Sequence, residues 1–470
     1  MDGPAGARVG NRRRRGGRPA RRVAPLRLPR PRASFPDYGP LHVAGSASDV
    51  RGWPARRLVR FGRAPAGGVP PQLPAPWRLS RRGSWVDRVR HERAVRRPQV
   101  RETLGTVFAL HIDTARSWRG GQQQVLLTVL GLRARGHRAV LVAHPEGELY
   151  RRASEGPDLV PLAPINEVDL AAAWQLSRLV RKWRPAIVHA HDPHAVAMVS
   201  LGLSFGAPVP RPKVVASRRV DFHLQGNTFS QWKYRQVDGF IAASGAIRDI
   251  LSHDGIPSGR IVVVHDGIDV EKIAHRPAAD LHAEYWLPHG VPVMVNVGAL
   301  VAHKGQRHLI DAMPMVLREV PDAHLVIFGE GELRAPLERQ IEHLSLEKRV
   351  LLPGFREDVL SLMKSSDLFV MSSIAEGLGS AVLDAMAMGL AVVGTRAGGI
   401  PEVVVPGETG ELVAPGDART LAAAIVKLLK DPALRRAHGE AGRQRVASQF
   451  DVEHLVDGTL SAYRQLGVCG

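Results

Sequence analysis

The sequence predicts an α/β protein with two doubly wound, Rossmann-like domains, preceded by a basic leader that we expect to be disordered. Short apolar runs alternate with helical stretches over residues 105–450, a pattern typical of parallel sheets covered on both faces. The alternation is interrupted once, at residues 270–290, which indicates one linker between two such units. The net charge, by contrast, is confined to the first hundred residues, which sets the leader apart.

The leader differs from the rest of the chain in composition. Residues 1–100 hold 24 arginines, no lysine and 5 acidic residues. The whole chain has 64 basic and 45 acidic residues, so the other 370 residues carry 40 of each and have no net charge. With 14 prolines and 12 glycines, the leader cannot bury enough apolar surface to offset its ordering entropy. Three interpretations remain open: an arm for nucleic acid or anionic membranes, a solvated tail without a role, and a start codon assigned too early. The absence of methionine between Met1 and Met198 favours the last, so nucleic acid is not expected as a partner.

We divide the 470 residues into four parts. Residues 1–104 are the leader, 105–275 a first Rossmann-like domain, 276–450 a second Rossmann-like domain, and 451–470 a C-terminal helix expected to pack back on the first domain. The single cysteine, Cys469, excludes an internal disulfide and fits a cytoplasmic protein. No apolar stretch is long enough to predict a membrane span.

The expected elements follow one another as strand and helix in both domains. In the first domain we predict strands at residues 107–112, 137–142, 186–190, 213–217, 239–243 and 261–264, with helices at 122–135, 169–183 and 245–253. In the second we predict strands at residues 292–297, 324–328, 350–352, 367–371 and 391–393, with helices at 306–318 and 420–430. Ligands bind beyond the carboxyl ends of such strands, which places the site in a cleft between two facing sheets.

Residues 372–389 carry the clearest chemical signal. A strand ends, a loop with two glycines follows, and a helix is predicted to begin near Ser380. Free N–H groups at a helix start bind anions, and glycines let a phosphate approach the backbone closely. Glu376 stands at the mouth of this loop. We therefore predict that a phosphate is bound by Gly377, Leu378, Gly379 and Ser380.

Asp384 is the only charged residue between Leu378 and Gly394. A carboxylate on so apolar a helix is costly unless something hydrogen-bonds it. A ribose diol would supply two donors, whereas the alternative is a helix cap or a salt bridge within the protein.

This segment resembles the signature of retaining glycosyltransferases of family 4, the glycosyl transferases group 1, in which two glutamates stand with seven residues between them. The resemblance covers residues 105–465 and implies the GT-B fold, with the acceptor bound by residues 105–275 and the nucleotide-sugar donor by residues 276–450. In that family the first acid contacts the donor sugar and the second holds the nucleotide ribose, which assigns a catalytic role to Glu376 and ribose binding to Asp384. Aspartate at the second position is one methylene shorter but keeps the carboxylate.

Other loops agree with this resemblance. Lys304, in residues 296–305, matches the lysine that holds the donor diphosphate, while Ala299 stands where the family has an arginine. The family places the loop of Gly120 and Gly121 against the donor phosphates and the acceptor. His191 matches the histidine that the family aims at the donor sugar, so it is the second catalytic candidate.

A histidine cluster supports a rival interpretation. His189, His191 and His194 have a spacing similar to that of zinc hydrolases, although Asp192 comes one place too early for that motif. A nucleotide-sugar epimerase, or a non-transferring relative with the same fold, is the other alternative.

Two basic features bear on the acceptor. Arg218 and Arg219 follow a predicted strand and would suit a phosphorylated or acidic acceptor, or else form a solvated pair. The helix at residues 169–183 ends in several cations, which suit either an anionic membrane surface or the helix dipole.

The resemblance implies a metal-independent, retaining glycosyltransferase that needs no cofactor and uses a nucleoside-diphosphate sugar as co-substrate. The sequence contains no Asp-x-Asp pair of the kind that anchors a metal-bound diphosphate. A glycan, lipid-linked or small-molecule acceptor is expected, with a role in lipopolysaccharide or other bacterial envelope glycan synthesis. Peripheral contact of the cytoplasmic protein with the inner membrane is part of this expectation.

Overall fold

The computed structural model describes residues 105–154, 158–224 and 226–468, which all belong to one compact unit. The predicted leader, residues 1–104, and Cys469 lie outside the described residues.

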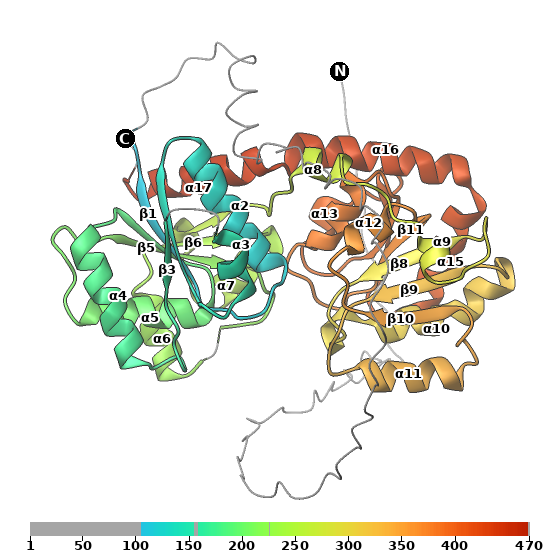
Figure 1. The fold of residues 1–470 in the computed structure, drawn as a ribbon, viewed down its shortest axis with the longest axis horizontal. Coiled ribbons are helices and arrows are strands. Elements are labelled where there is room, and N and C mark those ends of the chain that lie inside the picture. Colours follow the sequence, from blue (N-terminus) through green and yellow to red (C-terminus); the bar gives the residue numbers. More distant parts are fainter. Residues whose placement is uncertain (1–104, 155–157, 225, 469–470) are drawn as a thin grey trace, which may run out of the picture. The chain divides into compact units, whose positions relative to one another are not determined.

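The first sheet has seven parallel strands in the order β3-β2-β1-β4-β5-β6-β7 (Figure 1). Its strands are β1 (Phe108–Asp113), β2 (Arg138–Ala143), β3 (Leu159–Pro161), β4 (Ile187–Ala190), β5 (Lys213–Arg218), β6 (Gly239–Ala242) and β7 (Ile261–Val263). The helices between them are α2 (Gly120–Ala134), α3 (Glu148–Ala153), α4 (Leu170–Trp183), α5 (Pro193–Ser204), α6 (Thr228–Arg235) and α7 (Gly245–His253), with the 3-10 turn η1 (Ser258–Arg260).

The second sheet has six parallel strands in the order β10-β9-β8-β11-β12-β13. They are β8 (Val293–Val297), β9 (His324–Phe328), β10 (Val350–Gly354), β11 (Leu368–Met371), β12 (Val392–Thr395) and β13 (Gly410–Val413). The accompanying helices are α8 (Val270–Ala274), α9 (Leu281–Glu284), η2 (Ala302–Lys304), α10 (Gln306–Glu319), α11 (Arg334–His343), α12 (Val359–Met363), α13 (Ser380–Ala387), α14 (Ile400–Val403), α15 (Ala418–Lys430) and α16 (Pro432–Gln449).

Both sheets follow the Rossmann path, which confirms the predicted two-domain α/β fold. In each sheet the first strand lies in the middle and the next two strands extend the sheet to one edge. The following strands then start again beside the first strand and extend the sheet to the other edge. The direction reverses between β1 and β4 in the first sheet and between β8 and β11 in the second. Ligands of such sheets bind at this switch point, so the loops after these four strands are where a site is expected.

Apolar strands buried on both faces explain the sheets. Two clusters of buried side chains cover the faces of the first sheet, and two cover the second. Two edge strands, β3 and β13, were not predicted, because their sequences, Leu-Val-Pro and Gly-Glu-Leu-Val, lack the continuous apolar run of the inner strands. The interruption at residues 270–290 contains the short helices α8 and α9.

The last helix, α17 (Val452–Gln465), belongs to the core of the first sheet. It packs beside α2, where Val456 fills the space that a side chain on Gly131 would need. The chain reaches α17 from α16 at Asp451, which pairs with Ile268 through an isolated β-bridge. The linker between the sheets and the approach to α17 therefore run side by side.

None of the helices in the described part of the chain has the length and apolarity needed to cross a bilayer.

Candidate active site

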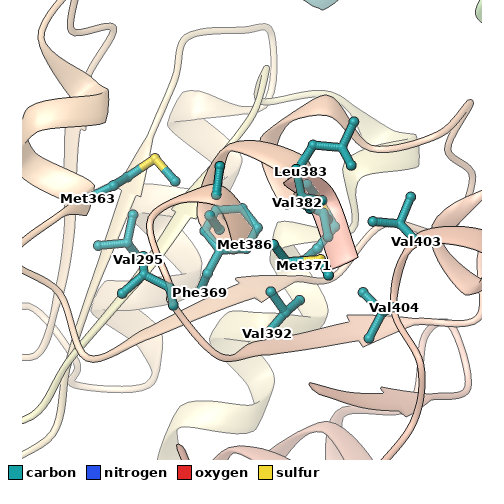
Figure 2. Close-up of a cluster of buried hydrophobic side chains, with 14 of the residues drawn as sticks. Val295, Met363, Phe369, Met371, Val382, Leu383, Met386, Val392, Val403 and Val404 are labelled. Atoms are coloured by element: carbon teal, nitrogen blue, oxygen red, sulfur yellow. The ribbon is translucent and has the colours of Figure 1, made fainter. Parts of the chain in front are cut away.

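The loop that was predicted to bind phosphate follows β11 at the switch point of the second sheet, and its binding of phosphate stays a prediction. Helix α13 begins at Ser380, and Gly379 before it has the left-handed φ of 97° that favours glycine. Because Gly379 has no side chain, the residue at the N-cap of α13 offers no capping group to the first N–H groups of the helix. The helix is held in place by its apolar face: Val382 and Met386 pack with Phe369 of β11 (Figure 2).

Asp384 lies one turn inside α13 and is half-buried. Burial raises the pKa of its carboxyl group to about 7, and the positive charge of Arg276 only partly opposes this shift. Among the described residues we find neither a hydrogen-bond donor nor an ion-pair partner for this carboxyl group. The structure therefore does not support the alternative of a cap or salt bridge, and the carboxyl group is available to a ligand.

Lys304 and Glu376 meet although 72 residues separate them in the sequence. Lys304 Nζ donates to Glu376 Oε2 at 2.6 Å, and Ser373 Oγ donates to the same oxygen at 3.0 Å. Both charged side chains are mostly covered, with exposed fractions of 19% and 12%. The site therefore combines one cation and one carboxylate in direct contact, beside the first turn of α13.

Gly120 and Gly121 form the first turn of α2 and not a loop before it. Gly120 faces Ser380 so closely that a Cβ atom on Gly120 would collide with Ser380 Oγ. The amino ends of α2 and α13 therefore approach each other. Two helix starts with free N–H groups in one place favour an anion such as a diphosphate.

His191 lies directly after β4 and is almost fully buried. Arg219 NH1 contacts His191 Nδ1 at 3.3 Å, and His191 Nε2 lies 3.0 Å from His111 Nδ1. A guanidinium can only donate, so Nδ1 of His191 accepts and its Nε2 carries the proton that bonds to His111. Arg219 is held in turn by Asp266, whose Oδ1 accepts from Nε at 3.0 Å. The direct contact of His191 with a donor sugar stays a prediction, and it requires His191 to release one of these bonds.

The side chains of His111, His189 and His191 are all neutral. Burial lowers the pKa of His111 to about 3, with Arg133 and Arg219 adding to the shift. Burial also holds the pKa values of His189 and His191 well below 6.5, because nearby imidazoles and Arg219 disfavour a further charge.

The zinc interpretation grouped His194 with His189 and His191, but the structure does not bring these three side chains together. His194 is about half exposed and lies 3.6 Å from Glu167, whereas the nitrogens that come together belong to His111, His189 and His191. The rings of His189 and His191 are stacked with centroids 4.1 Å apart, and both ring nitrogens of His191 already have partners in Arg219 and His111. His189 already bonds Tyr463 and Ser217, each at 2.8 Å. The cluster is therefore better described as a hydrogen-bonded network than as a metal site.

Arg218 and Arg219 have different surroundings. Arg219 is committed to Asp266 and His191, as described above. Among the residues that the structure describes, Arg218 bonds only the carbonyl of Phe222, at 2.6 Å, and its buried Nε has no partner. Of the two arginines predicted to bind the acceptor, Arg218 is therefore the one whose guanidinium still has N–H donors without a partner among the described residues.

Comparisons with known proteins agree with this geometry. Residues 118–272 match the family described as Glycosyltransferase Family 4, and residues 279–445 match Glycosyl transferases group 1. The chain is 30% identical over 296 residues to N-acetyl-alpha-D-glucosaminyl L-malate synthase of Bacillus anthracis, covering 61% of this chain and 77% of that protein. This chain is a family 4, group 1 glycosyltransferase.

Further relatives of this glycosyltransferase include the lipopolysaccharide core biosynthesis glycosyltransferase LpsE of Rhizobium meliloti, 35% identical over 179 residues, which is 38% of this chain and 50% of LpsE. Among solved structures, a glycosyltransferase from Rickettsia africae superimposes with a TM-score of 0.67 at 20% identity, covering 77% of this chain and 99% of that one. Anabaena Alr3699/HepE, solved in complex with UDP and glucose, gives a TM-score of 0.65 at 21% identity over 76% of this chain and 99% of that one. Neither the epimerase nor the zinc hydrolase alternative is favoured by these similarities.

Several site residues of the glycosyltransferase were not predicted. They are the buried residues His111, Asp113 and Asp266 of the first sheet, Tyr463 of α17, and Glu402, which joins α14 to the start of α7. Asp113 and His111 end the first strand, and polar residues at that place in an apolar run could have been noticed. Nothing in the local sequence marks Tyr463 or Glu402, because their partners are far away in the chain.

Proposed function

We propose that this glycosyltransferase moves a sugar from a nucleoside-diphosphate donor to an acceptor hydroxyl with retention of the anomeric configuration. The observation that carries the proposal is the combination of an ion pair, Lys304–Glu376, with two helix starts that approach each other and the carboxyl group of Asp384, which has no partner among the described residues. Phosphate, sugar and ribose each have a chemically suitable partner within this set. The presence of UDP and glucose in the HepE complex supports the same class of donor.

In this proposal the donor changes the partners of the ion pair. Lys304 turns toward the diphosphate, together with the N–H groups of Gly377, Leu378, Gly379 and Ser380, and stabilises the charge that develops on the leaving phosphate. Glu376 is then free to orient the sugar hydroxyls, and Asp384 accepts from the ribose diol. We assign no protein nucleophile, because the departing phosphate can take the acceptor proton on the same face of the sugar. His191 is proposed to assist near the anomeric carbon, and no metal is required.

The acceptor is proposed to be a glycan, a lipid-linked sugar or a small molecule in envelope glycan synthesis, as the LpsE similarity suggests. Peripheral membrane contact is proposed at α4. The segment before α4 exposes Ile165 and Val168, and the first turns of the helix expose Leu170 and Trp174. The guanidinium of Arg178 lies over the Trp174 ring, 4.9 Å from its centroid. Apolar side chains next to cations suit the surface of an anionic bilayer.

The donor assignment is tested by thermal shift and calorimetry with a panel of nucleoside diphosphates and their sugars. One nucleotide should stabilise the wild type, and Asp384→Asn and Lys304→Gln should each weaken its binding at least about tenfold, the effect of one lost charged contact. Asp322→Asn is the matched control, because this aspartate is 73% exposed in the same domain. If no nucleotide binds, or if Asp384→Asn binds as tightly as the wild type, the proposal fails. NMR of the product's anomeric centre tests retention.

A further inference from the structure

A cavity of about 460 Å³ opens at the carboxyl ends of β1, β4 and β5 in the first sheet. Its walls come from the loops that follow these strands and from α6, with Thr114, Asp192, Arg218, Phe222, Lys233 and Tyr234 among them. A space of this size is typical of pockets that hold a small organic molecule.

The charges that line this cavity are compensated, with one exception. Lys233 Nζ pairs with Glu167 at 3.1 Å. Asp192 accepts from the backbone N–H groups of Thr114 at 2.6 Å and Ala195 at 2.8 Å. Lys233, Glu167 and Asp192 therefore all have partners within the protein.

Arg218 is the exception. Within the described part of the chain no carboxylate lies at ion-pair distance from its guanidinium, which bonds only the Phe222 carbonyl. Burial lowers the pKa of Arg218, and the negative charges of Asp254 and Asp221, neither of which forms an ion pair with it, only partly oppose this shift. An anionic group in the cavity would remove this penalty and could accept two parallel N–H bonds from the fork of the guanidinium.

The cavity also borders the donor site. The ring of Phe222, one of its lining residues, meets His303 edge to face with centroids 5.4 Å apart. The Arg219 carbonyl, next to Arg218, approaches Gly377 so closely that no Cβ atom would fit there. The segment that carries Arg218, Arg219 and Phe222 therefore contacts both the loop of Lys304 and the loop of Glu376.

We propose that this cavity binds the acceptor, and that the acceptor carries a phosphate or carboxylate group held by Arg218. The inference rests on the proposed function, since it takes the bound molecule to be the acceptor of the transfer. It assigns Arg218 to the acceptor and leaves Arg219 to the internal network of His191 and Asp266.

A binding experiment tests the anion site directly. Inorganic phosphate and malonate are titrated separately into the full chain while saturating nucleoside diphosphate fills the donor site. Arg218→Gln should weaken binding at least tenfold, and Arg218→Lys should weaken it less, because lysine keeps the charge but loses the fork. Arg235→Gln, at an exposed position at the end of α6, should bind as the wild type does. Unchanged affinity in Arg218→Gln, or no binding of either anion to the wild type, overturns the inference.

Transfer assays identify the anion and separate the two proposals. Acceptors are compared as pairs that differ only by a phosphate or a carboxylate group. The wild type should prefer one charged member, and Arg218→Gln should raise the KM for it at least tenfold while leaving nucleotide affinity and the slow hydrolysis of the donor by water unchanged. Preference for the phosphate or for the carboxylate decides between the two sources. If the wild type hydrolyses the donor normally but prefers neither charged acceptor, only this inference fails. If the wild type neither binds nor hydrolyses the donor, the proposed function fails.

Discussion

At the scale of single residues, the site depends on two carboxyl groups in opposite situations. Glu376 is paired with Lys304 and Ser373, so it is held in one position before any sugar arrives. Asp384 has no such partner among the described residues, and burial raises its pKa to about 7. In the proposed function the first orients a polar sugar, whereas the second gains most from a ligand that hydrogen-bonds it.

Glu376→Gln should lower the rate of sugar transfer about a hundredfold or more, because a preorganised charge that faces the reacting sugar is typically worth about 3 kcal/mol. Steady-state kinetics with the identified donor measure the loss. Glu408→Gln, at an exposed position of the same domain, serves as the control and should be fully active. Near-normal turnover of Glu376→Gln would contradict the catalytic role proposed for Glu376.

Asp384→Asn should increase the free energy of unfolding at pH 8 by about 1–3 kcal/mol, although it weakens nucleotide binding. A raised pKa means that the folded protein holds the proton more tightly than the unfolded chain, so wild-type stability falls as the pH rises from about 4 to about 7. Asparagine carries no charge and avoids this loss. Urea denaturation at pH 8 and pH 4 measures both differences, and the gain should vanish at pH 4. A variant less stable than the wild type at pH 8 would contradict the assigned shift.

At the scale of elements, α17 joins the far end of the described chain to the first sheet. Its apolar face lies in the same cluster as β1 and β2, and its Tyr463 bonds His189, whose ring stacks on His191. The helix therefore both covers the sheet and fixes the histidine network. Its sequence shows only an amphipathic helix, and the partner of its apolar face is a property of the folded chain.

Leu460→Ala should lower the free energy of unfolding by about 2–5 kcal/mol, because Leu460 is 3% exposed in this cluster and the cavity left behind adds to the lost burial. Chemical denaturation measures the change, with the exposed Gln465→Ala on the same helix as the control. A loss below about 1 kcal/mol would show that α17 is only loosely attached.

At the scale of the whole described molecule, Glu402 and Ser244 connect the two sheets. The carboxylate of Glu402, from α14, accepts from the backbone N–H groups of Gly245 and Ala246 at the start of α7 and bonds His265 at 2.8 Å. Ser244 Oγ donates to the Gly377 carbonyl at 2.7 Å, which attaches the phosphate loop to the first sheet. These bonds hold the donor loop next to the cavity of Arg218.

Glu402→Gln should lower the free energy of unfolding at pH 7 by about 2 kcal/mol, the usual worth of hydrogen bonds to a charged group. Burial tends to raise the pKa of Glu402, but the bonds to His265 and to two backbone N–H groups outweigh it and lower the pKa overall. A lowered pKa gives stability that is present above the unfolded value and is lost as the pH falls through the folded value. The difference between variant and wild type, followed by denaturation from pH 7 downward, should therefore disappear in acid. A difference that does not change with pH would contradict an ionised Glu402.

Sequence alone determined the features that follow from local periodicity: the two sheets, most of the helices, and the strand-loop-helix segment that places Glu376 before α13 and Asp384 within it. These features are readable because an apolar strand or an amphipathic helix carries its own pattern of residues. Only the tertiary structure decided which side chains meet. It joined Lys304 to Glu376, placed His111 and not His194 beside His191, and separated Arg218 from Arg219, which are neighbours in the chain. Such encounters depend on strand order, because a parallel sheet brings the ends of distant segments to one edge, and no local pattern records that order.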